Sequence, residues 1–484
     1  MKFSSRLAAC AAAIALMPVT PALSQQSSVP APGTELVDLY TWLHAHPELS
    51  FKESTSSSIL AEELEELGFK VTTGLGDDWI REKSKRDEGT VRDGVGGYGV
   101  VGVYENGEGP TVLIRADMDA LPVPEQTGLD YASQVTSTTW TGVESPVMHA
   151  CGHDIHMTSW VGTARELMAN KDDWSGTLIM LAQPAEEIGL GAKAMIEGGL
   201  YSQFPLPDYN LALHVNASAP AGTIAYSSGY ALANVDSVDI LVKGVGGHGA
   251  YPHTTKDPIV VGSAIVMALQ TLVSRNVDPQ TPAVVTVGSF TAGAKHNIIS
   301  DAAELLLTVR SYDDATRQLL LDGIQRIAKA QAEAFGAPEP EISIDSDYTP
   351  STYNDPELTE MAMAAVSSAI GQDNVTEVKA VMGGEDFSQF GRTEEDVPGL
   401  IFWLGAVAPE TYQAAQEGGD ALPSLHSPFF APDAPPTIET GVSAMTAAAM
   451  SLFNQASATN AATETEMETE AEEAADTTSE TDSE

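Results

Sequence analysis

The stretch TLIMLAQPAEE, from Thr177 to Glu187, decides the expected fold. Its first six residues are β-rich and almost continuously apolar, which is typical of a strand buried on both faces of a sheet. Two adjacent carboxylates, Glu186 and Glu187, follow that strand. Open α/β sheets hold their ligands beyond the carboxyl ends of the strands, so we expect a functional site here.

Strand-like and helical patterns alternate on both sides of this stretch. Strands that alternate with helices indicate a largely parallel sheet covered on both faces. The first part of the chain is therefore expected to be an α/β domain. Its other strands are predicted at 99–104, 111–116 and 210–214, and its helices at 35–46, 54–67, 157–169 and 191–198.

A different order of elements begins near residue 233. The order is strand, helix, strand, strand, helix and strand, and this βαββαβ arrangement is typical of a ferredoxin-like sandwich. The patterns after Pro356 return to those of the first domain. We therefore predict a mostly parallel α/β domain at 25–232 and 350–454, interrupted by a smaller domain at 233–349. The elements of the smaller domain are expected at 237–243, 257–274, 283–290, 304–311, 315–335 and 341–345.

The N-terminus has the pattern of an export signal. Two cationic residues precede an apolar run from Leu7 to Val19, and small residues stand before Gln25, which predicts a signal peptide at 1–24. The run is shorter than the roughly 20 residues that span a bilayer. We expect a periplasmic or secreted protein without stable membrane insertion after cleavage. A lipid on Cys10 is an alternative reading of the same segment.

The chain is strongly acidic, with a formal net charge of −45. Such a surface repels nucleic acid and anionic membranes, so neither is an expected partner. The segment 455–484 holds 10 Asp and Glu residues and no Lys or Arg. It lacks the apolar residues that would offset its ordering entropy, so we expect a disordered acidic tail. The charged, glycine-rich stretch 77–97 is expected to be an exposed loop.

The densest group of reactive side chains is VMHACGHDIH, from Val147 to His156. Cysteine thiolate and histidine imidazole both bind borderline divalent metals, and a glycine between them lets the chain turn tightly around an ion. After signal removal Cys151 is the only cysteine, so no intrachain disulfide can form. A buried structural cysteine is the alternative reading of this residue.

Carboxylates follow two of the expected strands. Glu186 and Glu187 cannot both point the same way from an extended chain, so one can bind metal while the other faces substrate and water. A metal lowers the pKa of bound water toward about 7 and a free carboxylate takes the proton, which is the chemistry of hydrolysis. A solvated helix start is the alternative for this pair. Asp117 and Asp119 either bind metal or orient a ligand histidine.

Two single histidines add potential ligands. His214 is expected at the end of a fourth strand, and His426 lies near the C-terminus in the segment LHSP. A lone histidine is often structural. One sheet would, however, bring these side chains and the carboxylates to the same edge.

With these residues assembled, the chain from Asp38 to Ala448 resembles the metal-dependent amidohydrolases that include aminoacylases and carboxypeptidases. Within them it is most similar to the branch of hippurate hydrolases and auxin-conjugate hydrolases. The resemblance implies an inserted dimerisation or lid domain, two divalent metal ions (Mn, Zn or Co) and a homodimer or higher homo-oligomer. The motifs that carry it are WLHAHPELSFKE (Trp42 to Glu53), IRADMDALPVPEQTG (Ile114 to Gly128), MHACGHDIH (Met148 to His156), QPAEE (Gln183 to Glu187), ALHV (Ala212 to Val215), GGHGAYPH (Gly246 to His253), MGGEDFS (Met382 to Ser388) and LHSPFF (Leu425 to Phe430).

The resemblance also implies roles for individual residues. Glu186 is the implied general base, and His248 the implied lid histidine that reaches a neighbouring subunit's site and stabilises the oxyanion. Asp119, and with it Asp117, would support the ligands, and Asn297 would lie near the substrate carboxylate. A loop histidine and a turn asparagine are the alternatives for His248 and Asn297. The implied metal ligands are Cys151, His153, Glu187, His214 and His426.

The chain departs from the family pattern at three places. Ile155 stands where a glycine is usual, Ser300 stands where a proline is usual, and 77–92 looks like an insertion. None of these removes an implied ligand or the base, although each could reshape substrate choice.

The expected function is hydrolysis of the amide bond of N-acyl amino acids, with an aromatic or aliphatic acyl group, to a carboxylic acid and an amino acid. The closest alternative is a carboxypeptidase or dipeptidase that acts on small peptides with the same machinery. A non-catalytic exported binding protein and a metal-storing protein are further alternatives. Neither of these roles needs a base beside the ligands.

Overall fold

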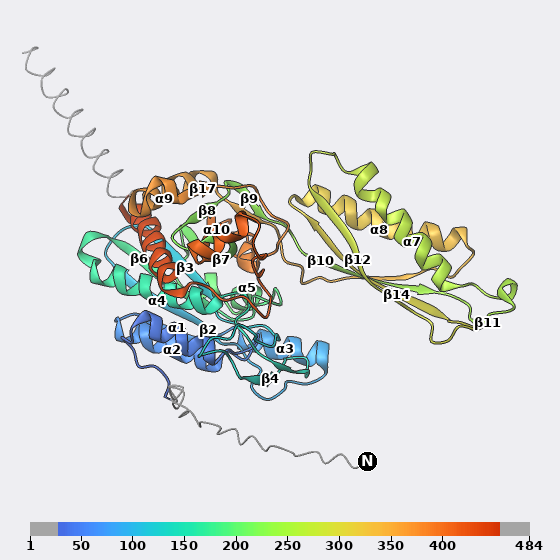
Figure 1. Cartoon of the computed structure of the whole chain (residues 1–484), viewed down its shortest axis with the longest axis horizontal. Coiled ribbons are helices and arrows are strands. Elements are labelled where there is room, and N and C mark those ends of the chain that lie inside the picture. The colour runs from blue at the N-terminus through green and yellow to red at the C-terminus, as the bar shows by residue number, and fades with distance from the viewer. Residues whose placement is uncertain (1–27, 455–484) are drawn as a thin grey trace, which may run out of the picture.

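The structure is a computed structural model that describes residues 28–454. The expected signal peptide at 1–24 and acidic tail at 455–484 lie outside the described residues. The expected fold class is confirmed: an α/β domain with a large, mostly parallel sheet is joined to a smaller α/β sandwich (Figure 1).

The large sheet has eight strands in the order β1-β2-β6-β3-β7-β18-β8-β17. At its centre β6, β3, β7 and β18 run parallel, whereas β2 runs antiparallel to both of its neighbours, β6 and the edge strand β1. The central strands are nearly continuous apolar runs because both faces of the sheet are covered. The bounds are Lys70–Leu75 (β1), Gly99–Asn106 (β2), Thr111–Asp117 (β3), Gly176–Gln183 (β6), Tyr209–Pro220 (β7), Ile224–Tyr226 (β8), Val375–Glu377 (β17) and Gly399–Val407 (β18).

Two apolar cores lie on opposite faces of this sheet. Val112 and Ile114 of β3 pack into the larger core, and Leu113 between them packs into the smaller one. The larger core contains residues of α1, α2, α4, α9 and the helix over residues 434–454, and the smaller core contains residues of α5 and α6. The bounds are Leu36–Ala45 (α1), Ser54–Glu66 (α2), His153–Ala169 (α4), Gly191–Glu197 (α5), Leu200–Gln203 (α6) and Pro356–Ile370 (α9).

The smaller domain is a four-stranded antiparallel sheet in the order β12-β14-β10-β15, covered by α7 and α8 (Figure 1). Along the chain its elements follow the expected βαββαβ order. Each helix begins at an aspartate whose side chain caps the first turn: Asp257 accepts from the N–H of Ile259, and Asp313 accepts from the N–H of Thr316. The bounds are Asp236–Lys243 (β10), Pro258–Asn276 (α7), Ala283–Ala292 (β12), Ala302–Ser311 (β14), Asp314–Ala334 (α8) and Glu341–Ile344 (β15).

Short elements join the domains and extend them. β9 (Gly229–Leu232) pairs with β16 (Thr352–Asn354), and these two segments enter and leave the smaller domain. β11 (Gly247–His248) and β13 (Ile298–Ile299) form a ribbon at the far end of that domain (Figure 1). The larger domain also contains a short hairpin, Thr136–Thr138 (β4) and Glu144–Pro146 (β5), and a short helix, Pro409–Gln416 (α10).

The expectation of an exposed loop at 77–97 is wrong over its first half, because Asp77–Glu88 form the helix α3. Acidic residues lie in its first turn and basic residues in its last turn, where they complement the helix dipole. Arg81 pairs with Asp77 at 2.6 Å across one turn, and Ile80 is buried. The charge pattern that suggested a loop is therefore the solvated face of an amphipathic helix.

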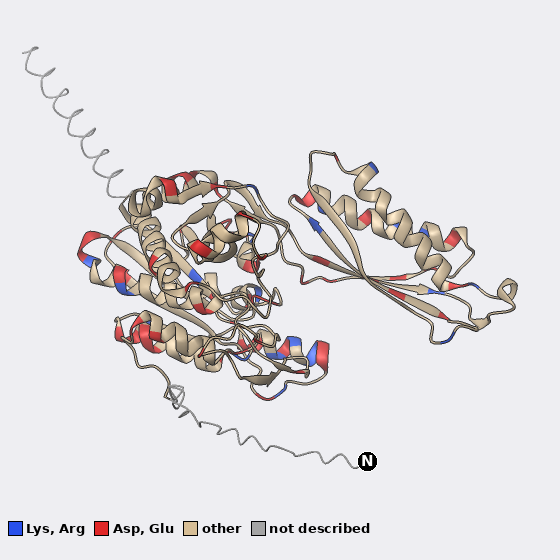
Figure 2. Cartoon of the chain, viewed as in Figure 1, with Lys and Arg blue, Asp and Glu red and all other residues tan. Residues whose placement is uncertain are grey.

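Asp and Glu residues are spread along the elements of both domains, with fewer Lys and Arg residues among them (Figure 2). A dispersed negative surface of this kind favours solubility rather than binding of nucleic acid.

Candidate active site

Three parallel strands bring the candidate residues to one edge of the large sheet. β3 ends at Asp117, and β6 ends at Gln183, two residues before the pair of glutamates. The prediction that a strand ends at His214 is wrong, because β7 continues to Pro220 along β18. β3 pairs with β7 only as far as Ala212, so His214 lies beyond the paired part of β3, level with Asp117 at the end of that strand.

A glycine lets the cysteine–histidine segment turn into α4. Gly152 has a φ of +79°, and a Cβ there would lie 2.6 Å from Cγ2 of Val215. α4 begins at the next residue, His153, earlier than the start at residue 157 that the pattern predicted. Cys151 and His153 therefore flank a tight turn, and their donor atoms lie close enough to share an ion.

A buried carboxylate holds the turn that carries the two glutamates. Ala185, directly before Glu186, has a φ of 54°, and Phe51 has a φ of 63°. These left-handed values are unfavourable for residues that have a Cβ. Glu53 is fully buried and accepts a hydrogen bond at 2.9 Å from the backbone N–H of each of them. Glu53 thus stabilises both strained residues and the turn that aims Glu186.

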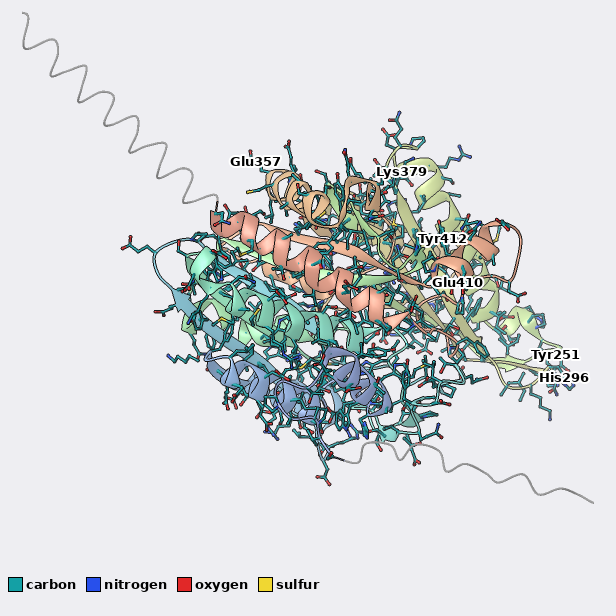
Figure 3. The ribbon with its side chains drawn as sticks, turned by 60° about the vertical axis from the view of Figure 1, so that its left-hand side comes forward. Tyr251, His296, Glu357, Lys379, Glu410 and Tyr412 are labelled. Atoms are coloured by element: carbon teal, nitrogen blue, oxygen red, sulfur yellow. The ribbon has the colours of Figure 1, made fainter. Side chains whose placement is uncertain are left out.

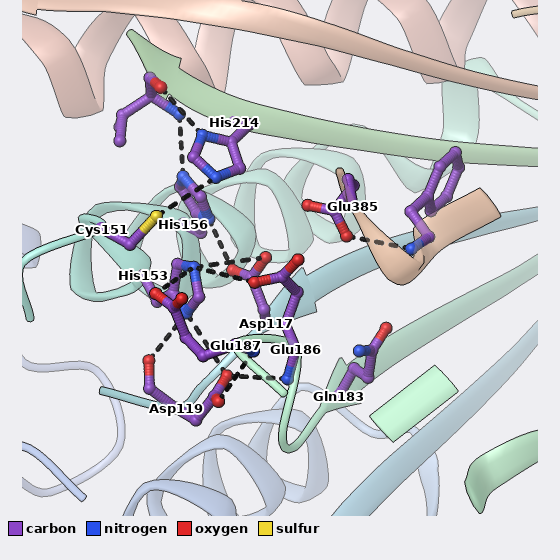
Figure 4. A network of polar contacts seen from close by, with 12 residues as sticks. Asp117, Asp119, Cys151, His153, His156, Gln183, Glu186, Glu187, His214 and Glu385 are labelled. Carbon is purple, nitrogen blue, oxygen red and sulfur yellow. Dashed lines mark hydrogen bonds and ion pairs between the residues drawn. The ribbon is translucent and has the colours of Figure 1, made fainter. Parts of the chain in front are cut away.

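The five implied metal ligands surround one space, and Figure 4 shows four of them. The Sγ of Cys151 lies 3.5 Å from Nε2 of His214, and Nε2 of His153 lies 3.9 Å from Oε1 of Glu187. Oε2 of Glu187 lies 3.4 Å from Nε2 of His426. The donor atoms form two groups of three that share Cys151, and within each group they lie within 4.8 Å of one another. Sulfur, imidazole and carboxylate donors in this arrangement suit borderline divalent cations.

Two donor atoms show that the cluster fits a metal. Nε2 of His153 and Oε1 of Glu187 are buried, and neither has a hydrogen-bond partner among residues 28–454. A buried polar atom without a partner costs about 1–3 kcal/mol. A divalent cation between these two atoms would satisfy both.

For His153 and His214, hydrogen bonds fix which ring nitrogen faces the cluster. Nδ1 of His153 donates to the backbone carbonyl of Asp119 at 2.7 Å. Nδ1 of His214 donates to the backbone carbonyl of Val215 at 2.8 Å. Because a carbonyl only accepts, Nε2 of each ring keeps its lone pair for a metal.

His156, in the same motif, is excluded as a ligand by its contacts. Its Nε2 accepts from the backbone N–H of Val215 at 2.8 Å, and its Nδ1 donates to Asp117 at 2.5 Å. Both ring nitrogens are therefore engaged. Burial lowers the pKa of His156 to about 3, which keeps the ring neutral as these two bonds require.

The aspartates after β3 lie behind the cluster. Asp119 accepts hydrogen bonds from the backbone N–H groups of the two glutamates at 3.0 and 3.1 Å. Asp117 accepts from His156 and, at 2.6 Å, from Arg115. Both carboxylates are fully buried, so they orient the residues around the site.

Glu186 lies beside the ligand cluster, with its carboxylate 3.9 Å from Nε2 of His153. Its oxygen also lies within 4.8 Å of oxygens of Glu385 and Asp386. Burial raises the pKa of Glu186, and the charges of Glu385 and Glu187 raise it further. A carboxylate with a raised pKa is suited to take a proton and return it within one reaction.

Arg115 is a buried cation below the site to which the sequence-based prediction assigned no role. Its guanidinium donates to Asp117, Gln183 and Glu385 at 2.6, 2.9 and 2.7 Å. Burial lowers the pKa of Arg115, but the charges of Asp117 and Glu385 outweigh it and raise the pKa. An arginine inside an apolar strand needs acidic partners, and that signal could have identified Arg115 as a buried cation, although not which carboxylates pair with it.

A cleft of about 760 Å³ opens over these residues. Its lining includes the ligand cluster, Glu186 and, from β14 of the smaller domain, Arg310. Within the described range, the hydrogen bonds of Arg310 go to two neutral groups, the hydroxyl of Thr308 at 3.1 Å and the carbonyl of Met382 at 3.4 Å. Burial lowers the pKa of Arg310. An anionic group of a ligand in the cleft would therefore find a cation that has no carboxylate bonded to it.

The structure does not bring His248 and Asn297 to this cleft. Both are exposed on the ribbon of β11 and β13, where the N–H of Gly249 donates to the carbonyl of Asn297 at 2.9 Å. Tyr251 and His296 on this ribbon lie at the extremity of the smaller domain in Figure 3. The role of His248 at a neighbouring subunit's site stays a prediction.

Comparisons with known proteins agree with this geometry. Residues 113–462 match the family described as Peptidase family M20/M25/M40. The chain is 37% identical over 373 residues to thermostable carboxypeptidase 1 of Saccharolobus solfataricus, and this alignment covers 76% of this chain and 85% of that protein. It is 37% identical over 351 residues to hippurate hydrolase of Campylobacter jejuni, and this alignment covers 72% of this chain and 82% of that protein. The crystal structure of a dinuclear metal-binding peptidase of the M20 family from Bacillus subtilis aligns with a TM-score of 0.64 at 29% identity, over 87% of this chain and 98% of that chain.

Proposed function

Because the chain belongs to the peptidase family M20/M25/M40 and is a metal-dependent hydrolase of amide or peptide bonds, we propose that it cleaves N-acyl amino acids to a carboxylic acid and an amino acid. The resemblance that its motifs indicated is confirmed by these relatives. The observation that carries the proposal is the cluster around His153 and Glu187 with a separate carboxylate, Glu186, in the same cleft.

Metal and base have separate roles in the proposed reaction. Bound divalent ions, either Mn, Zn or Co, would polarise the scissile carbonyl and lower the pKa of water. Glu186 takes the proton of the attacking water and delivers it to the nitrogen of the leaving amino acid. Asp119 holds the backbone of Glu186 and Glu187, so base and ligand keep their relative positions. The proposed ligands are Cys151, His153, Glu187, His214 and His426.

Arg310 supports an amino acid as the leaving group. The amino acid that leaves as a product has a free carboxylate, and this group is already present in the substrate. In the cleft that holds Glu186, Arg310 offers a planar guanidinium that bonds to no carboxylate of the described residues. A neutral amide without a carboxylate would leave this half-buried cation without an anionic partner. We therefore place the carboxylate of the substrate at Arg310.

The relatives leave a carboxypeptidase or dipeptidase as the second candidate, because one of them is a carboxypeptidase. A panel of N-benzoyl, N-acetyl and dipeptide substrates, assayed with protein loaded with Mn²⁺, separates the two. We expect the acyl amino acids to be cleaved faster. Uniformly faster cleavage of the dipeptides would transfer the proposal to peptides. No turnover of any substrate, with metal confirmed present, would instead support a non-catalytic binding protein.

We also propose that the protein is exported to the periplasm or secreted, which the signal-like pattern at 1–24 supports.

We further propose that two copies associate through the smaller domain. α7 is long and apolar enough by composition to cross a membrane, but its buried side chains pack against the small sheet. Its outer side exposes Ile259, Val260 and, at 70% exposure, Met267. Covering such a surface with a second copy would remove it from water. A wild type that sediments as a monomer, indistinguishable from Met267→Asp, would count against this association.

A further inference from the structure

A second cavity, of about 270 Å³, lies next to the catalytic cleft. Its walls are mainly apolar and come from four separate segments of the chain. Glu187 is the charged residue in its lining. The apolar wall residues used below are Leu49, Ala120, Leu121, Trp140 and Ile188.

The cavity adjoins the cleft at the metal-ligand cluster. Glu187 and Ile188 line both spaces, so a molecule that spans them must pass the ligand side chain of Glu187. Arg310 lines only the cleft. A substrate held with its carboxylate at Arg310 and its amide at the cluster therefore has the small cavity available for its other end.

One wall of the cavity is rigidly connected to the site. Leu49 and Ala120 form a β-bridge. The neighbouring Ser50 donates to Asp119 at 2.6 Å, and Asp119 accepts from the backbone N–H of Glu187 at 3.1 Å. The buried carboxylate of Asp119 therefore connects this wall to the implied metal ligand Glu187.

Trp140, at the tip of the β4–β5 hairpin, forms another part of the cavity wall. Its ring meets that of Phe51 edge to face at 6.0 Å between centroids, and its carbonyl accepts from Arg92 at 2.8 Å. Phe51 belongs to an apolar cluster that includes Ile80 of α3. The segment that looked like an insertion thus supports the residue that closes this cavity.

We propose that this cavity is the subsite for the acyl group of the substrate, and that it takes an aromatic ring or a branched aliphatic chain. The inference rests on the proposed function and specifies its substrate. An apolar cavity of about 150 Å³ is enough to bind benzene. The cavity here is larger than that, so a phenyl group fits with its linking carbonyl directed to the cluster. The charged amino acid half is excluded, because the cation that would pair with its carboxylate lies in the cleft.

The test crosses one wall substitution with changes at either end of the substrate. Trp140→Ala removes a ring from the cavity wall, and Val143→Ala is the matched control on the same hairpin, 62% exposed and outside the cavity lining. We expect Trp140→Ala to lower kcat/KM for N-benzoylglycine by about 10-fold or more and for N-acetylglycine by less than about 2-fold. Val143→Ala leaves both values unchanged.

A second substitution protects the test from misfolding of the first. Ile188→Phe fills the cavity from its mouth, and we expect it to reduce cleavage of N-benzoylglycine while N-acetylglycine is still cleaved. Equal loss for both substrates in Trp140→Ala and Ile188→Phe would overturn the proposal. A loss of kcat/KM that depends instead on the amino acid half of the substrate, measured by comparing N-acetylglycine with N-acetylphenylalanine, would also overturn the proposal. The cavity would then hold the leaving group.

Failure of the proposed function has a different signature. In that case metal-loaded wild type cleaves none of these substrates. Binding of benzoate, followed by tryptophan fluorescence, then decides the subsite alone. Saturable binding to wild type that is lost in Ile188→Phe supports it, and the absence of binding to wild type overturns it.

Discussion

Removing the carboxylate of Glu53 should disable the site without touching a ligand or the base. Glu53 accepts two backbone hydrogen bonds at 2.9 Å, from Phe51 and Ala185, and both donors have a left-handed φ. Glu53→Ala leaves these two buried N–H groups without acceptors and frees Ala185 to relax. Because Ala185 directly precedes Glu186, this relaxation should move the base.

The size of the effect follows from these contacts. A buried N–H group left without an acceptor costs about 1–3 kcal/mol, and two are left here, so Glu53→Ala should lower the free energy of unfolding by about 2–6 kcal/mol. Displacement of a catalytic group by about 1 Å can cost about 100-fold, which is the expected loss in kcat/KM. Burial raises the pKa of Glu53, and the charge of Asp119 raises it further. A neutral amide should therefore substitute well, and Glu53→Gln should cost less than about 1.5 kcal/mol.

Urea unfolding followed by far-UV circular dichroism, together with hydrolysis of N-benzoylglycine at saturating Mn²⁺, measures both effects. Ala185→Gly is the matched control, because glycine tolerates a φ of 54° and should stabilise the turn by about 1 kcal/mol. A change below about 1 kcal/mol in Glu53→Ala, or equal damage by Glu53→Gln, would refute this reasoning.

Three further predictions concern buried charges. Burial lowers the pKa of His44, but its hydrogen bonds to Asp154 and Glu125 outweigh burial and raise the pKa to about 9. Protonated His44 therefore contributes at most about 3 kcal/mol to the free energy of unfolding below about pH 6.5. This contribution is lost as the pH rises through about 9. Urea unfolding between about pH 6 and pH 10 should show this decline in wild type and less of it in His44→Gln, and equal slopes would contradict it. Asp119→Asn should weaken metal binding by about 10–100-fold in a chelator competition, and an unchanged affinity would show that the carboxylate does not orient the ligands. Arg115→Met leaves buried carboxylates without their cation and should destabilise the fold by about 3–5 kcal/mol, whereas a melting temperature equal to that of wild type would show that these carboxylates are neutral.

The sequence was sufficient for features in which residue type alone sets the position. The apolar run from Thr177 to Ala182, with Glu186 and Glu187 a few residues beyond it, predicted a buried strand whose carboxyl end meets a polar site, and β6 has that form. α3 was missed because its apolar residues are few, and what stabilises it is burial of Ile80 together with ion pairs that charge alone does not reveal.

Contacts between distant segments could not be read from the sequence. Arg115 meets Glu385 across 270 positions of the chain, and Arg310 reaches the cleft only because the smaller domain is placed beside it. The position of His248 depends on the same placement, and in a single chain the ribbon that carries it lies at the end of the smaller domain remote from the large sheet (Figure 1). These relations depend on packing in three dimensions rather than on local pattern.

The central claim is that Glu186 is the base of a metal-dependent hydrolase. The measurement that tests it most directly is the rate of benzoate release from N-benzoylglycine by protein beginning at Gln25, compared with Glu186→Gln at equal, measured Mn²⁺ content. We expect the variant to bind the same amount of metal and to lose about 100-fold or more in kcat. A variant that retains full metal and a tenth or more of the wild-type kcat would contradict the claim and place the base elsewhere in the cleft.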